Sequence, residues 1–211
     1  MSGASLDPFK QLGLRPSLWM DLGSLKARYL QLAASCHPDH ETCPDEDQLA
    51  GNQTSELASE LHQAYGILSR VSSRIKSFLI EYCQADCSPL KIVPEDLGDR
   101  FMEVGALLGE CDRVLANKPA EDAPELTRVV FMKQGLEKRQ HCQALRTAIE
   151  EDLLGMEVQL KSYQRRLDAD SHEPSCFGPD EVAHLVQLYH RWNFLERWKE
   201  QLSQRILEFM I

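Results

Sequence analysis

Several features of membrane, secreted and nucleic-acid-binding proteins are missing from this sequence. No apolar run approaches the roughly twenty residues that a transmembrane helix needs. The first residues lack the basic and apolar blocks of a secretion signal and the arginines of an organelle transit peptide. Acidic residues outnumber basic ones, 33 to 23, for a formal net charge of −10. Binding to nucleic acid or an anionic membrane requires clustered cations, so we expect neither.

The cysteines and the absence of catalytic motifs narrow the expected compartment and the class of function. The seven cysteines are odd in number and include no C-x-x-C pair. This pattern is typical of reduced thiols in a cytoplasmic protein. The sequence shows no hydrolase triad, no phosphate-binding glycine loop and no paired catalytic carboxylates. We therefore expect a protein that is not an enzyme and needs no cofactor.

Strand patterns are almost absent, whereas helical periodicity recurs along the chain. With 211 residues, 43% of them hydrophobic, the chain has ample core material. Asp21 is placed to cap the second helix, and Pro94 to begin the fourth. The pattern predicts an all-α protein with helices over residues 8–12, 22–36, 55–82, 94–115, 124–168 and 182–209.

The predicted helices fall into two groups. Polar residues and Pro89 interrupt the periodicity over 84–93, which indicates a linker between a domain at 1–83 and a three-helix bundle at 94–211. In the bundle, apolar residues over 145–167 alternate by threes and fours, as in an antiparallel coiled-coil seam. The fourth predicted helix has an apolar stripe of Leu97, Phe101, Val104, Leu108, Cys111 and Leu115.

A His-Pro-Asp tripeptide, His37 to Asp39, lies between the second and third predicted helices. Proline cannot continue the helix before it and favours an extended conformation at His37. The imidazole and carboxylate are therefore expected on a loop at the open end of a helical hairpin. Such a loop suits contact with another protein.

This setting resembles a J-domain. The segment Asp7–Leu14 (DPFKQLGL) is similar to the opening of that family, and Leu61–Leu68 (LHQAYGIL) is similar to its third helix. The resemblance covers about residues 5–82 and implies that the chain stimulates ATP hydrolysis by a DnaK-class chaperone. It implies contact through His37, Pro38 and Asp39, with Lys26 and Arg28 as the nearby positive charges.

A terminal J-domain before an acidic three-helix bundle further resembles HscB, the co-chaperone of iron–sulfur cluster assembly. Trp192–Trp198 (WNFLERW) is similar to the last helix of that family, and Arg100–Glu103 (RFME) to the start of its scaffold-binding face. The resemblance implies an HscA-type chaperone and an IscU-type scaffold protein as partners. The implied client-binding residues are Phe101, Met102, Gly105 and Phe194.

The client-binding residues have structural alternatives. Phe101 lies on an apolar stripe and is also compatible with the bundle core, as are Trp192 and Trp198. Gly105 and Gly109 lie one turn apart, a spacing that suggests close approach by a neighbouring or a partner helix, although both glycines are also compatible with simple tolerance in the helix. The family tends to carry leucine and acidic side chains at Gly105, Ala106 and Gly109.

Two other functions remain open from the sequence. The chain is also compatible with a J-protein that serves a different client. Cys36, His37, His40 and Cys43 are residue types that bind zinc, so a metal-binding or redox protein is a further alternative. Adjacent ligands such as Cys36 and His37 diverge in direction, which weighs against this metal site.

Overall fold

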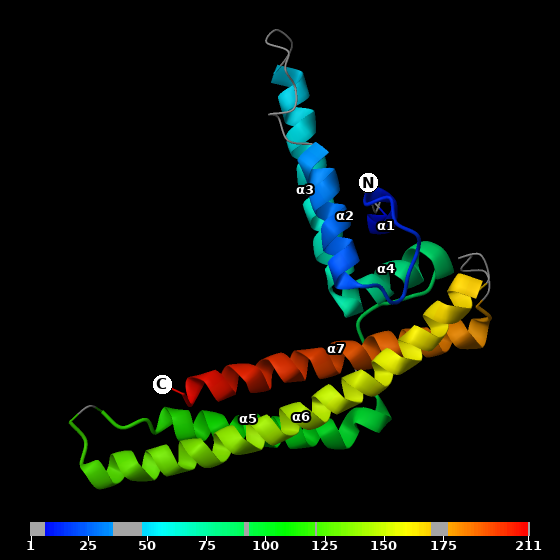
Figure 1. Cartoon of the computed structure of the whole chain (residues 1–211). Coiled ribbons are helices and arrows are strands. Elements are labelled where there is room, and N and C mark those ends of the chain that lie inside the picture. The colour runs from blue at the N-terminus through cyan, green and yellow to red at the C-terminus, as the bar shows by residue number, and fades with distance from the viewer. Residues whose placement is uncertain (1–6, 36–47, 91–92, 121, 170–176, 211) are drawn as a thin grey trace. The chain divides into compact units, whose positions relative to one another are not determined.

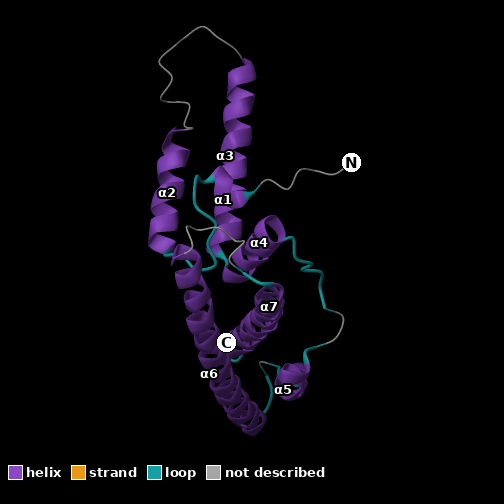
Figure 2. Cartoon of the chain, turned by 90° about the vertical axis from the view of Figure 1, so that its right-hand side faces the viewer, coloured by secondary structure: helices purple, strands orange, loops and turns teal. Residues whose placement is uncertain are grey.

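The computed structural model describes residues 7–35, 48–90, 93–120, 122–169 and 177–210. Within these residues it contains helices and no strand, which confirms the predicted all-α class (Figure 2). No helix among them combines the length and apolar character that crossing a membrane requires. In chain order the elements are α1 Pro8–Gln11, α2 Leu22–Ser35, α3 Gln48–Ser69, α4 Val71–Cys83, the 3-10 turn η2 Glu95–Leu97, α5 Gly98–Ala116, α6 Glu125–Ala169 and α7 Pro179–Glu208 (Figure 1).

The chain forms two compact units. The first comprises Met1–Ser88 with Gln159–Tyr189, and the second comprises Pro89–Val158 with His190–Ile211. Helices α6 and α7 thus contribute residues to both units. The linker expected at 84–93 begins where α4 ends, because Gln84 has a left-handed conformation (φ 52°) that stops the helix.

Helix α1 begins at an N-terminal cap that also ties it to α4. The side chain of Asp7 accepts hydrogen bonds from the backbone N–H of Phe9 (3.0 Å) and from the hydroxyl of Tyr82 (2.5 Å). Asp7 is buried, and its carboxylate satisfies an N–H that the first helical turn leaves without a partner. The bond to Tyr82 and burial raise the pKa of that phenol, with burial the larger cause.

Helix α2 begins as the sequence predicts. Ser24 donates its backbone N–H to Asp21 Oδ2 at 2.7 Å, and this bond lowers the pKa of the Asp21 carboxyl. The helix packs on α3 through Tyr29, whose ring stacks on Tyr65 with centroids 4.6 Å apart. The two helices therefore form the predicted hairpin.

The prediction of one continuous third helix over 55–82 is wrong. Helix α3 ends at Ser69 and α4 begins at Val71, because Arg70 is extended (φ −93°, ψ 125°). The break leaves the carbonyl of Leu68 without its helical partner, and Arg74 Nη1 donates to that oxygen at 2.7 Å. The guanidinium thus satisfies a group that a continuous helix would have satisfied internally.

Arg74 is the largest fully buried side chain among the described residues. Besides the bond to Leu68, its Nε donates to the carbonyl of Leu18 at 3.3 Å. The guanidinium also lies over the ring of Trp19, 5.6 Å from its centroid. Burial lowers the pKa of Arg74 to about 10, so it stays charged at neutral pH. One cation therefore joins the α1–α2 segment to the α3–α4 break.

The last part of α6 and the first part of α7, with the segment between them, belong to the first unit as well. Gln164 Oε1 accepts from the backbone N–H of Leu18 (2.7 Å) and of Trp19 (3.1 Å). The ring of Phe177 contacts that of Phe78 edge to face, with centroids 6.2 Å apart. These contacts fasten the amino-terminal helices to residues 159–189.

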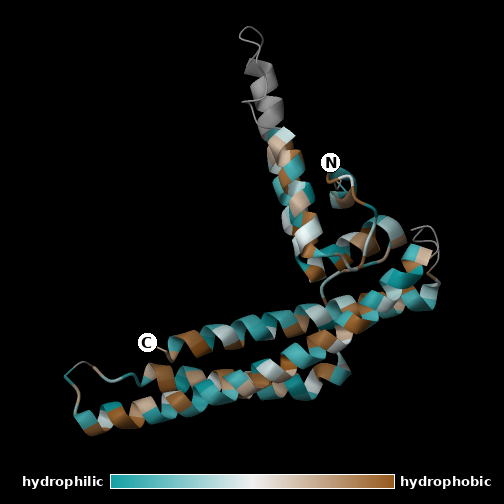
Figure 3. Cartoon of the chain, in the orientation of Figure 1, coloured by the Kyte–Doolittle hydropathy of each residue, from teal (hydrophilic) through white to brown (hydrophobic). Residues whose placement is uncertain are grey.

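The second unit is a three-helix bundle of α5, α6 and α7. Arg100 on α5 pairs with Asp152 on α6, and Glu110 pairs with Lys138, so the two helices are antiparallel. Hydrophobic and hydrophilic residues alternate along each ribbon, as expected of helices that bury one face (Figure 3). The buried core is Leu97, Val104, Leu107, Cys111, Cys142, Leu145, Ile149, Leu153, Met156, Trp192, Leu195, Trp198, Leu202 and Ile206.

Helix α7 lies parallel to α5 in this bundle. Arg191 pairs with Asp96 at 3.1 Å, and Arg205 pairs with Asp112 at 2.6 Å, so residue numbers rise together along the two helices. The seam predicted on α6 is confirmed, since its apolar members are buried except for the half-buried Tyr163.

Helix α5 departs from its predicted form at two points. Regular α-helix begins at Gly98, and a single 3-10 turn occupies the residues just after Pro94. Phe101 is 46% exposed, whereas Leu107, off the predicted stripe, is buried. Because α5 packs against both α6 and α7, its buried face is centred between them, and Phe101 lies at the edge.

Candidate functional site

The His-Pro-Asp tripeptide lies outside the described residues, between the end of α2 and the start of α3. The structure therefore does not test His37, Pro38 and Asp39 as contact residues. It does describe the helices that flank the tripeptide in sequence. They pack side by side as a hairpin, so the tripeptide lies in the segment of the sequence that joins two neighbouring helices.

The two cations expected near this loop differ in their surroundings. Lys26 is exposed on α2. Arg28 is half-buried, and its Nε donates to the carbonyl of Leu12 at 3.0 Å. Its Nη2 lies 2.8 Å from where a Cβ at Gly13 would stand, and Gly13 has a φ of 60° that favours glycine. Arg28 thus supports the end of α1, and its contact with a partner stays a prediction.

We use the name client face for the four residues that the resemblance implies as client-binding: Phe101, Met102, Gly105 and Phe194. Met102 is 69% exposed, and Phe194 is half-buried. The rings of Phe101 and Phe194 both contact Trp198, with centroid separations of 6.3 and 5.7 Å. Trp198 is buried, as expected, and supports two aromatic rings at the surface. The sequence places Trp198 in the core but gives no sign of this contact.

Two glycines of α5, the exposed Gly105 and the half-buried Gly109, leave open space where a side chain would stand. A Cβ at Gly105 or Gly109 would meet no heavy atom within 4 Å. The prediction that Gly105 and Gly109 allow close approach by a neighbouring helix of this chain is therefore wrong. Without side chains there, the exposed backbone of α5 is accessible to a partner.

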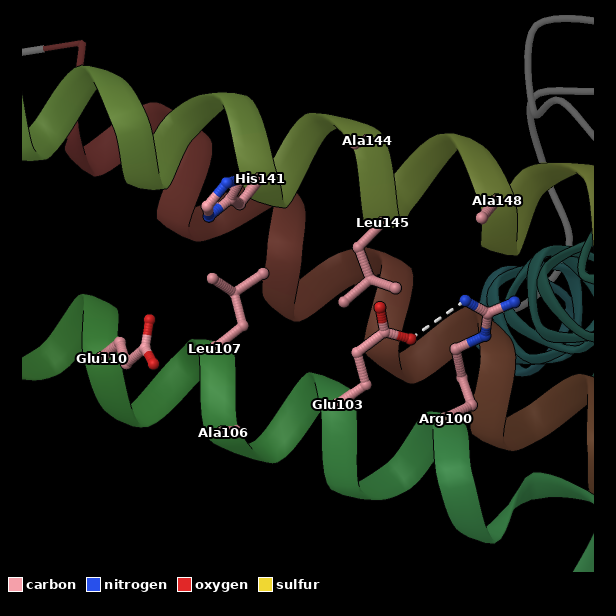
Figure 4. A pocket seen from close by; sticks show the side chains of 9 residues that line it. All are labelled: Arg100, Glu103, Ala106, Leu107, Glu110, His141, Ala144, Leu145 and Ala148. Carbon is pink, nitrogen blue, oxygen red and sulfur yellow. Dashed lines mark hydrogen bonds and ion pairs between the residues drawn. The ribbon is translucent and has the colours of Figure 1, made fainter.

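A groove of about 440 Å³ runs between α5 and α6 (Figure 4). Leu107 and Leu145 form its apolar floor, and the ion pair of Arg100 with Glu103 closes one end at 3.2 Å. At the other end, a hydrogen bond from Lys138 lowers the pKa of Glu110. The groove is lined by Arg100, Glu103, Ala106, Leu107, Glu110, His141, Ala144, Leu145 and Ala148.

Among the described residues, no group of three or more His, Cys, Asp or Glu is placed to hold a metal ion. The predicted cluster of Cys36, His37, His40 and Cys43 lies outside them and is untested. One thiol pair does occur in the bundle core: the sulfur atoms of Cys111 and Cys142 are 3.6 Å apart. Burial raises the pKa of both thiols, that of Cys142 to about 12, so both are protonated at neutral pH.

Two solved structures that resemble this chain are HscB proteins. The chaperone HscB from Vibrio cholerae superposes with a TM-score of 0.50 and 17% identity, covering 94% of this chain and 96% of that chain. The human co-chaperone HscB matches with a TM-score of 0.48 and 16% identity, covering 94% of this chain and 85% of that chain. No protein-family model and no curated protein sequence matches. The chain therefore has the fold of the Vibrio cholerae HscB chaperone, as the resemblance found in the sequence predicts.

Proposed function

We propose that this protein is a co-chaperone of the HscB type, which delivers a client to a DnaK- or HscA-class chaperone and stimulates its ATPase. The observation that carries the proposal is the His-Pro-Asp tripeptide between α2 and α3 of a chain with the HscB fold. No catalytic centre is part of this function, which works by binding. We place it in the cytoplasm, where free thiols stay reduced.

In this proposal residues 1–83 act as the J-domain, 84–93 as the linker and 94–211 as the client-binding bundle. The end of α4 at Cys83 and the start of η2 at Glu95 are consistent with this division. The contacts of Gln164 and Phe177 would hold the J-domain against the ends of α6 and α7.

His37 and Asp39 would contact the ATPase chaperone, with Lys26 supplying positive charge. A carboxylate is a strong acceptor for a cationic donor on the partner. Arg28 is the less accessible of the two α2 cations, because it is bonded to Leu12.

The chaperone step is tested by single-turnover ATP hydrolysis of a DnaK- or HscA-class chaperone, with and without this protein. We expect His37→Gln and Asp39→Asn to return the rate to the basal level while helix content by circular dichroism stays unchanged. Met102→Ala is the matched control, because its side chain is exposed on a different unit and should leave stimulation without client intact. Full stimulation by His37→Gln would refute the J-domain mechanism.

The client in this proposal is an iron–sulfur scaffold protein of the IscU type, and the client face binds it. Met102 and Phe101 are exposed, and the half-buried ring of Phe194 shares its contact with Trp198 with that of Phe101. Exposed apolar side chains that gather on one surface mark interaction sites. The buried Trp198 fixes the two rings in place, which reduces the conformational entropy lost on binding. The proposal that the client face binds the scaffold is thus supported by apolar side chains that are open to solvent and by two rings that Trp198 holds in place.

A further inference from the structure

A second apolar surface lies at the end of the bundle where α5 ends, α6 begins and α7 ends. We call it the tip groove. It has a volume of about 640 Å³ and is lined by Leu115, Lys118, Val129, Phe131, Met132, Lys133, Gly135, Leu136, Arg139, Glu208, Phe209 and Met210. Figure 3 shows hydrophobic residues at the start of α6 and at the end of α7. Leu115 is fourteen residues along α5 from Phe101, or about 21 Å at the helical rise, so the tip groove is separate from the client face.

The apolar side chains of the tip groove are unusually exposed. Val129 is 54% exposed and Met132 is 70% exposed, and Leu136 and Met210 are exposed as well. Phe209 packs against α6 because Gly135 has no side chain: a Cβ there would stand 3.1 Å from the ring. The end of α7 therefore forms one wall and leaves the row of Val129, Met132 and Leu136 open on α6.

Cations outnumber carboxylates in the lining of the tip groove, three to one. Lys118, Lys133 and Arg139 line it, and none of them makes an ion pair with another described residue. The one lining carboxylate, Glu208, is already paired with Arg205 at 2.5 Å. The net positive rim indicates an acidic partner. It disfavours a symmetric pairing of two copies through this groove, because two rims of the same sign would then face each other.

We propose that the tip groove binds an amphipathic helix of a partner protein, with apolar side chains in the groove and acidic side chains against the rim. The walls are helices, whose backbone groups are bonded internally. An extended segment would find no strand edge to pair with, whereas a helix satisfies its own backbone. A flat lipid surface would not fill a recess between three helices. Val129 to Arg139 spans about 15 Å, enough for apolar anchors at i, i+3 or i+4, and i+7.

The test selects binders from a displayed library of 20-residue helical peptides, with the full chain as bait. The apolar face of the peptides varies among Leu, Ile, Phe, Met, Ala and Ser, and the flanks vary among Glu, Gln and Lys. Enriched peptides are then titrated by fluorescence anisotropy. We expect enrichment of apolar residues at helical spacing with acidic flanks, and affinity that falls as salt rises.

Neighbouring valines on α6 give a matched pair of variants. Val129→Asp, in the groove, should weaken binding at least tenfold, whereas Val130→Asp, 47% exposed but outside the groove, should change it less than twofold. Lys133→Glu should weaken the binding of peptides with acidic flanks and strengthen the binding of peptides with lysine flanks. Met132→Asp replaces Val129→Asp if the latter does not fold. Met102→Ala should leave peptide binding intact, which separates this result from that of the client face.

Four outcomes would overturn the proposal: no enrichment over the Val129→Asp bait, enriched flanks that are basic or neutral, equal losses for the two valine variants, or loss on Met102→Ala. Two further measurements examine other occupants of the surface. Dimerisation in sedimentation velocity that Val129→Asp abolishes would assign the groove to a second copy. Cosedimentation with phosphatidylcholine–phosphatidylglycerol vesicles that the same variant abolishes would assign it to a membrane. Either result would refute the peptide-binding proposal.

Discussion

Truncating the client face should reduce affinity for the scaffold protein without unfolding the bundle. The change is the double variant Phe101→Ala with Met102→Ala. Full burial of a large apolar side chain contributes about 1.5–3 kcal/mol. The side chains are 46% and 69% exposed, so a partner that covers them gains about 0.7–1.4 kcal/mol from Phe101 and about 1–2 kcal/mol from Met102. We expect a loss of about 1.7 to 3.4 kcal/mol, roughly 20- to 300-fold in Kd.

Isothermal titration of purified scaffold measures this loss, and thermal melts by circular dichroism accompany it. Leu126→Ala on α6 is the control, because that side chain is 76% exposed and α6 runs antiparallel to α5, which places its first turn at the other end of the bundle from Phe101. Its truncation should leave affinity unchanged. Trp198→Ala tests the buried support: it should lower the free energy of unfolding by about 3–5 kcal/mol. Affinity within twofold of the wild type, with a normal melt, would show that this face does not bind the scaffold.

Two further predictions concern stability. Arg74→Met removes charged donors from two buried carbonyls, so we expect urea unfolding to show a free energy of unfolding lower by about 2–4 kcal/mol. The exposed Arg70→Met is the control and should lower it by less than about 0.5 kcal/mol. Equal losses would contradict the role given to the Arg74 guanidinium. The pKa of Cys142 is raised by burial from 9.0 to about 12, so its contribution to stability is complete below pH 9 and is lost as pH rises from 9 to 12. The urea midpoint of the wild type should therefore fall more steeply between pH 9 and 11 than that of Cys142→Ala, and parallel curves would exclude a shifted thiol.

The sequence by itself determined the helical class, most helix positions and the α6 seam. Each is a local property, set by the spacing of apolar residues and by caps such as Asp21, so neighbouring residues suffice to predict it. The His-Pro-Asp tripeptide and its flanking segments carried the J-domain resemblance. The acidic bundle that follows, with the segments RFME and WNFLERW, carried the HscB resemblance, which the fold confirms. Of the site residues, Met102 and Phe194 were named through the resemblance, whereas the sequence left the exposure of Phe194 undecided; in the structure Met102 is 69% exposed and Phe194 is half-buried.

Only the tertiary structure decided the break between α3 and α4, because no proline or glycine marks Arg70. The break is stable because Arg74, four residues away, supplies the donor that the interrupted helix lacks. The exposure of Phe101 was likewise not local: periodicity defines an apolar stripe, but two neighbouring helices decide which edge of it is covered. The tip groove has the same origin, since α5, α6 and α7 each contribute one wall. Periodicity shows that a helix has a face to bury, and packing decides which part of that face is left for a partner.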